Sequence, residues 1–123
     1  MLDQGQTEAV RQAFDLRQRA GQRAAISGLV AMPTETVYGL ACNAANPDAV
    51  ARLSEAKGRP RFNPLIAHVA SMEMAEQEAV FSAQAREIAA RFWPGPLTLA
   101  LPVAKTGTVS DIARAGLDTI ALR

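Results

Sequence analysis

Three cations crowd into five positions of this chain: Lys57, Arg59 and Arg61, in the stretch KGRPRFNP. Pro60 and Pro64 restrict the backbone and bias the residue before each of them toward extended conformations. Side chains alternate along an extended segment, so the three cations would project from the same side. A row of cations on a stiffened loop suits a polyphosphate. A solvated surface turn explains the same residues, and charge clusters more often belong to the surface than to a site.

The single histidine, His68, lies inside the apolar run LIAHV at residues 65–69. In a strand it would share a face with Ile66, opposite the other apolar side chains. A satisfied core or edge histidine is the plainer interpretation. A nucleophilic pair with Cys42 is disfavoured, because nothing in the sequence brings the two residues together and the setting LACNAA is typical of packing.

Hydroxyl side chains directly follow the apolar run at residues 28–32, in the segment PTETVYGL. Thr34 and Thr36 would either cap a short helix, with Glu35 in its first turn, or offer hydrogen bonds to a ligand from a loop at the carboxyl end of a strand. Neither GxxxxGK[ST] nor GxGxxG occurs in the chain. The common nucleotide-binding fingerprints are therefore absent.

Helical and strand patterns alternate around these clusters, which indicates α/β architecture. The helix after Asn46 has the clearest boundaries, with Asn46 as N-cap, Pro47 at the first helical position and Gly58 just past the end. The predicted segments are a helix at 6–20, a strand at 28–32, a helix at 47–57, a strand at 65–69, a helix-rich region at 71–91 with a break near Ser82, a stop at 93–96, a strand at 97–103, a turn at 105–107 and a strand at 119–123.

Composition limits the class of protein. The chain has 123 residues and is 49% hydrophobic, so we expect one domain with a hydrophobic core. Its net charge is +1, so no overall electrostatic field would attract it to nucleic acid or to an anionic membrane. One cysteine excludes an internal disulfide. The N-terminal segment has no apolar core of signal-peptide type, and no window is long enough to span a membrane. The sequence favours a soluble cytoplasmic protein.

Taken together, PTETVYGL, KGRPRFNPLIAHV and FWPGPLT closely resemble the YrdC-like family, whose best-known members are threonylcarbamoyl-AMP synthases. The resemblance covers residues 28–123. It implies a single YrdC-like domain over residues 1–123, built as a twisted open mixed sheet with flanking helices. It also implies a nucleotidyltransferase that makes L-threonylcarbamoyladenylate and pyrophosphate from ATP, L-threonine and bicarbonate, the first step of N6-threonylcarbamoyladenosine modification of tRNA.

The same resemblance assigns the site residues. Lys57, Arg59, Asn63 and Thr119 match positions that contact ATP, and the first two form the K-x-R signature that binds the phosphates. The positions that hold L-threonine are matched by Thr34, Tyr38, His68 and Arg123, the last of which would pair with the carboxylate. No residue is expected to act as a nucleophile or a metal ligand, so catalysis would rest on positioning and charge stabilisation. Mg²⁺ would bridge phosphate oxygens of ATP.

One departure from the family pattern affects the extent of the chain. Family members carry a second signature, Ser-x-Asn, downstream of the strand that here ends at Arg123, and no Ser-x-Asn occurs in this sequence. The chain also ends within a strand pattern, so we expect it to be truncated at its C-terminus, with an incomplete domain whose own activity is in doubt.

Two other functions stay open from the sequence. One is a carbamoyl-transferring maturation domain, and the other is a non-catalytic paralogue that binds tRNA or double-stranded RNA. Near-neutral charge and an aromatic content of 5% disfavour a stand-alone RNA binder. If the enzyme interpretation holds, the partners are ATP, L-threonine and bicarbonate, with tRNA-modification proteins acting downstream and no membrane.

Overall fold

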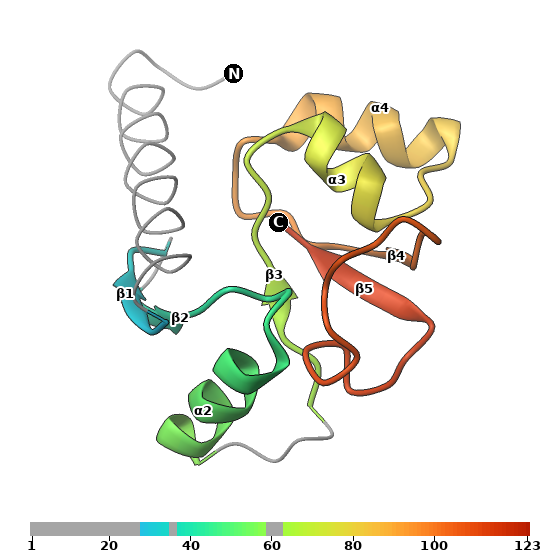
Figure 1. The fold of residues 1–123 in the computed structure, drawn as a ribbon. Helices are drawn as coiled ribbons and strands as arrows, with labels where there is room; N and C mark the ends of the chain where they lie inside the picture. The colour runs from blue at the N-terminus through green and yellow to red at the C-terminus, as the bar shows by residue number, and fades with distance from the viewer. Residues whose placement is uncertain (1–27, 35–36, 59–62) are drawn as a thin grey trace.

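The computed structural model describes residues 28–34, 37–58 and 63–123. Three earlier predictions lie outside these ranges: the helix at 6–20, the cations Arg59 and Arg61, and the hydroxyl of Thr36. The described residues form a mixed α/β structure in which α3 and α4 lie together on one side and α2 lies apart from them (Figure 1).

Helix α2, Pro47–Lys57, confirms the prediction at both of its ends. The Asn46 side chain accepts hydrogen bonds from the backbone N–H groups of Asp48 and Ala49, at 3.0 and 3.2 Å, which satisfies two donors that the first turn leaves unpaired. Gly58 ends the helix in the left-handed region, with φ of 61°. These caps fix both ends of α2 and therefore the position of Lys57, its last residue.

The predicted helix-rich region contains two helices, α3 (Met72–Glu78) and α4 (Ala83–Phe92). The break falls where Ser82 caps α4 by accepting from the Ala85 N–H at 3.1 Å. Helix α4 ends at the predicted stop, where the Trp93 indole N–H donates to the Leu97 carbonyl at 2.8 Å. Ser71 caps α3 in the same way by accepting from the Met74 N–H at 3.2 Å, so both serine caps use the same chemistry as the Asn46 cap.

The described strands form one antiparallel pair and one mixed three-stranded sheet. In the mixed sheet β5 is central, parallel to β3 and antiparallel to β4. The strands are β1 (Val30–Met32), β2 (Gly39–Ala41), β3 (Ile66–Ala67), β4 (Leu99–Pro102) and β5 (Thr119–Leu122). The mixed pairing agrees with the expected open mixed sheet.

Two sequence predictions differ from the observed strands. The run at 65–69 was expected to be a buried strand, but β3 has two residues and Ile66 is 42% exposed. The residues around β3 pair with backbone outside the named strands: the Leu65 N–H donates to the Ala113 carbonyl at 2.8 Å, and the Val69 N–H donates to the Arg123 carbonyl at 3.1 Å. Strand β2 was not predicted at all. Its residues, Gly-Leu-Ala, lack the β-branched and aromatic side chains that signal a strand.

The main core lies between the sheet and helices α3 and α4. Leu122 at the end of β5 is fully buried, and the Phe81 and Trp93 rings meet edge to face with centroids 6.3 Å apart. The other buried members of this cluster are Ala67, Ala75, Ala79, Ala85, Ala89 and Ile120. Within the described part of the chain, no helix is both long and apolar enough to cross a membrane.

Candidate functional site

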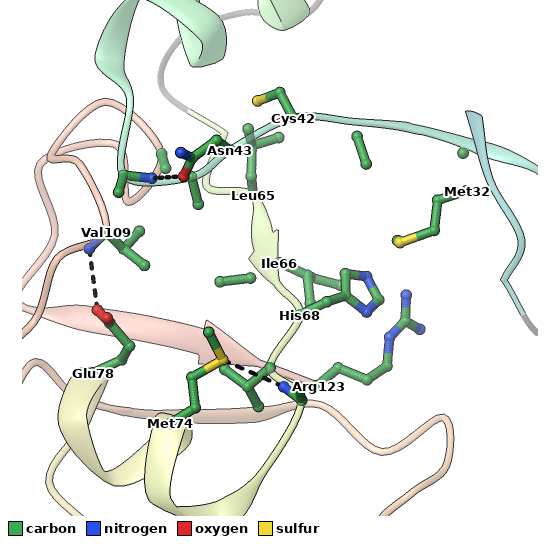
Figure 2. Close-up of a pocket in the computed structure, with 18 of the residues that line it drawn as sticks. Met32, Cys42, Asn43, Leu65, Ile66, His68, Met74, Glu78, Val109 and Arg123 are labelled. Carbon is green, nitrogen blue, oxygen red and sulfur yellow. Dashed lines mark hydrogen bonds between the residues drawn. The ribbon is translucent and has the colours of Figure 1, made fainter. Parts of the chain in front are cut away.

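A cavity of about 720 Å³ opens beside β3 and the end of β5 (Figure 2). Its walls come from β1 and β2, the residues around β3, α2, α3 and the segment that follows β4. This volume lies in the range of small-molecule sites. The lining is largely apolar, with a few polar side chains, four of which were predicted site residues: Thr34, Lys57, His68 and Arg123.

His68 and Arg123 occupy paired positions. The register of β3 and β5 sets Ala67 opposite Leu122, so the next residues along the parallel ladder, His68 and Arg123, are partners. The Arg123 N–H donates to the Ala67 carbonyl at 3.0 Å, and its carbonyl accepts from the Val69 N–H at 3.1 Å. Paired residues project from the same face of a sheet. Both side chains accordingly lie on the same side of the cavity (Figure 2).

Thr34 stands in a hydrogen-bonded loop between β1 and β2. Its Oγ1 donates to the Val37 carbonyl and accepts from the Val37 N–H at 3.2 Å. Gly39 packs beside it, where a Cβ would lie 3.6 Å from the Thr34 Cγ2. Residues 35 and 36 lie outside the described residues, so the ligand-binding loop stays a prediction beside the alternative that Thr34 acts as a cap. Thr34 joins the cavity wall from the side of the small sheet.

Lys57 lines the cavity from the C-terminal end of α2 and is itself exposed. A cation at this end of a helix is stabilised by the helix dipole, whatever else it binds. Its ammonium group is free to reach an anion in the cavity because the side chain is long and solvated.

The other three predicted ligands within the described residues, Tyr38, Asn63 and Thr119, are exposed and are not among the residues that line the cavity. Tyr38 is 75% exposed. Thr119 lies four residues before Arg123 on β5, so strand alternation puts it on the same face, about 13 Å away along the strand. Thr34, His68, Arg123 and Lys57 are the predicted ligands that the cavity brings together.

The sequence offered no sign that Cys42 and His68 would meet, yet both line this cavity. The unpredicted strand β2 is the reason, because it carries the chain along the cavity just before Cys42. Burial raises the pKa of the Cys42 thiol, and the Arg52 guanidinium lowers it by a smaller amount. A thiol with a raised pKa is a weak nucleophile at neutral pH. Cys42 thus belongs to the wall of the cavity.

Sequence reasoning also missed Glu78, the last residue of α3, which is 6% exposed and lines the cavity. Its carboxylate accepts hydrogen bonds from residues 108 and 109 of the segment after β4. No local pattern marks a helix-terminal glutamate as buried, because the partners lie about 30 residues away in the sequence. Among the described residues, no group of three or more His, Cys, Asp or Glu side chains is placed to hold a metal ion.

Comparison with known proteins gives consistent matches. The family model Sua5_yciO_yrdC, described as telomere recombination, matches residues 24–123. The threonylcarbamoyl-AMP synthase of Pyrococcus abyssi is 55% identical over 96 residues, and that of Bacillus subtilis is 50% identical over 96 residues. Each match covers 77% of this chain and 28% of the relative. This chain thus spans little more than a quarter of the length of these two relatives.

A solved structure shows the same arrangement of the backbone. P. abyssi Sua5 complexed with L-threonine superposes with a TM-score of 0.72 at 47% sequence identity, over 93% of this chain and 31% of that one. At this score the two chains share a fold over nearly all of the present sequence. The mixed sheet and its helices are therefore those of that fold.

Proposed function

Because this chain belongs to the Sua5/YciO/YrdC family, we propose that it is the part of a threonylcarbamoyl-AMP synthase that binds L-threonine and the phosphates of ATP. The protein would convert L-threonine, bicarbonate and ATP into L-threonylcarbamoyladenylate and pyrophosphate. The relatives that carry this name support the proposal, as does the L-threonine bound by P. abyssi Sua5. Residues 1–123 would belong to one YrdC-like domain.

The observation that carries the proposal is the pairing of His68 with Arg123 on one wall of the cavity. An amino acid needs a cation for its carboxylate and polar groups for its amine and side chain. The planar guanidinium of Arg123 would bind the carboxylate in a two-pronged fashion. His68 and the Thr34 hydroxyl would supply the polar contacts, and Tyr38 would reach the same substrate from its loop.

Lys57 would bind the ATP phosphates from the end of α2, together with Arg59. Asn63 and Thr119 would contact the nucleotide further out. Two anionic substrates repel each other, so fixed cations on two sides of one cavity lower the cost of bringing them together. Lys57 and Arg123 line the same cavity from different elements, as this role requires.

The reaction needs no side-chain nucleophile. The threonine amine and bicarbonate would combine to a carbamate with loss of water, and a carbamate oxygen would then attack the α-phosphorus and displace pyrophosphate. The protein would contribute orientation of the two substrates and stabilisation of the developing charge. Mg²⁺ would enter with ATP, since phosphate oxygens are among its preferred ligands.

The product would be passed to downstream tRNA-modification proteins, and tRNA itself is a further proposed partner. The cytoplasm would be the place of action, because tRNA and ATP are both available there. Part of the nucleotide site would come from residues beyond this sequence, in keeping with the share of the relatives that the chain spans.

The test is pyrophosphate release from ATP, measured with and without L-threonine and bicarbonate, by these 123 residues and by the whole product of their gene. Release that depends on both L-threonine and bicarbonate in the whole product would support the proposal. Release that is independent of threonine would contradict it. Binding of tRNA with a steep salt dependence and no response to ATP or threonine would favour an RNA-binding function instead.

A further inference from the structure

The carboxylate of Glu78 holds a stretch of irregular backbone. Its Oε2 accepts from the N–H groups of Thr108 and Val109, at 2.7 and 3.1 Å, and its Oε1 accepts from the Thr108 hydroxyl at 2.6 Å. Glu78 is more than nine-tenths buried. A buried carboxylate is stable only when its oxygens accept several hydrogen bonds. These three bonds provide that environment.

Main-chain groups at the end of α3 also hold the segment that follows β4. The Glu78 carbonyl accepts from the Ala104 N–H at 3.0 Å, and the Gln77 carbonyl accepts from the Thr106 hydroxyl at 2.7 Å. At Gly107, a Cβ would come within 3.3 Å of the Glu78 carbonyl and carboxylate oxygens. The backbone at 104–109 thus lies directly against the end of α3.

The same segment continues to the opposite part of the cavity. The Ser110 N–H donates to the Ala44 carbonyl just before α2, at 2.9 Å, and the Ala113 carbonyl accepts from the Leu65 N–H just before β3, at 2.8 Å. Residues 104–113 therefore connect α3 with the entrances to α2 and β3. We call this segment the cavity brace.

The cavity brace forms a wall that faces the predicted threonine ligands. Thr108, Val109 and Ala113 line the cavity together with Glu78. In Figure 2, Glu78 and Val109 lie at one side of the cavity, and His68 and Arg123 lie at the other. A displacement of the brace would change the width of the space in front of His68 and Arg123.

We propose that Glu78 is a positioning residue that fixes the cavity brace and so sets the distance between this wall and the His68–Arg123 wall. The inference rests on the proposed function for its substrate, L-threonine, and on the hydrogen bonds of Glu78 for its geometry. Glu78 acts through Thr108 and Val109. Its loss would leave two backbone N–H groups without their acceptor.

Three variants of the whole gene product test the role. Glu78→Ala removes all three acceptor bonds. Glu78→Gln keeps the shape, and its amide oxygen can still accept from the two backbone N–H groups while its amide N–H₂ donates to the Thr108 hydroxyl. Gln77→Ala is the matched control, because Gln77 is exposed, lies one residue away on α3 and gives its backbone carbonyl to the brace.

Two readouts are needed. The first is amide hydrogen exchange at residues 108 and 109. We expect it to be about tenfold faster in Glu78→Ala and close to wild type in the other two variants. Loss of the acceptor would favour local opening by about 1.4 kcal/mol, which is a factor of ten in the opening equilibrium. The second is the KM for L-threonine in pyrophosphate release. It should rise roughly 10-fold or more in Glu78→Ala, with kcat/KM largely restored in Glu78→Gln.

Unchanged exchange at residues 108 and 109 in Glu78→Ala would refute the claim that Glu78 fixes the cavity brace. Faster exchange with an unchanged threonine KM would overturn the positioning role. If Glu78→Ala does not fold, Thr108→Val decides: it removes the hydroxyl bond alone, and the proposal requires a smaller rise in the same KM. A wild-type protein without threonine-dependent activity would refute the proposed function, while the exchange measurement would still decide whether Glu78 holds the brace.

Discussion

Arg123 is hydrogen-bonded through its main chain to the residues on both sides of His68. Its N–H donates to the Ala67 carbonyl at 3.0 Å, and its carbonyl accepts from the Val69 N–H at 3.1 Å. The pairing is a property of the sheet register and does not depend on any side-chain contact. The main-chain position of Arg123 relative to His68 is therefore set by the backbone.

Arg123→Lys should raise the KM for L-threonine roughly 10- to 100-fold and leave the KM for ATP nearly unchanged. The ammonium keeps the charge but loses the planar pair of donors that matches a carboxylate. His68→Ala should also weaken the use of threonine with ATP binding largely kept. Steady-state pyrophosphate release at varied concentrations of each substrate measures both effects. A rise confined to the KM for ATP would show that these residues contact ATP and that their assignment to L-threonine is wrong.

Lys57→Ala should abolish adenylate formation, with a fall of at least about 100-fold in kcat/KM for ATP, because a fixed positive charge beside the phosphates is lost. Stability should change by less than about 0.5 kcal/mol, since Lys57 is exposed. Arg91→Ala is the control: it removes an exposed cation from the last turn of α4, outside the residues that line the cavity. Equal activity of the two variants would refute phosphate binding by Lys57.

Asn46→Ala should lower the free energy of unfolding by about 1 kcal/mol, because two N–H groups of the first turn of α2 lose their acceptor. Asn46→Ser should recover most of this loss, because serine is also a good cap. Urea unfolding followed by circular dichroism measures both. An alanine variant as stable as the wild type would show that solvent replaces the cap at no cost.

Cys42 should react with iodoacetamide more slowly at pH 7.5 in the folded protein than in the urea-unfolded chain. Burial raises the pKa of this thiol, and alkylation requires the thiolate. The rate should rise with pH through a midpoint that is higher in the folded protein. A raised folded pKa also means that the thiol stabilises the fold below its unfolded pKa and loses this contribution as the pH rises through the folded value.

Arg52→Ala should slow the alkylation of Cys42 further, because the Arg52 guanidinium lowers the pKa of the thiol. Arg91→Ala, which removes an exposed arginine from α4, serves as the control. Faster alkylation in Arg52→Ala than in this control would mean that the guanidinium shields the thiol sterically more than it acts through charge.

Local chemistry made the helices predictable. Asn46, Pro47 and Gly58 marked α2 at both ends, and Ser82 marked the break between α3 and α4, because caps and stops depend on a few neighbouring residues. The short strands were harder. Strand β2 lacks β-branched and aromatic residues, and Leu65, just before β3, pairs with the distant irregular backbone at Ala113.

The candidate site was only partly visible in the sequence. Thr34, Lys57, His68 and Arg123 were chosen through a family resemblance, and the cavity brings these four together. Glu78 and Cys42 were missed as wall residues because their neighbours in space are remote in the sequence. No periodicity or motif reports contacts of that kind, since burial of a polar side chain depends on tertiary partners.

The central strand β5 follows both of its sheet neighbours, β3 and β4, along the chain. During synthesis from the N-terminus, β3 and β4 are therefore made before the strand that joins them. The sheet can close only after residue 122 has been made, through contacts between remote parts of the chain, which fold slowly. Until then both strands lack the partner that they have in this sheet, and an unpaired strand edge can associate with another chain. The pairing of β5 with β3 also sets Arg123 beside His68, so this wall of the cavity would form only when these strands come together.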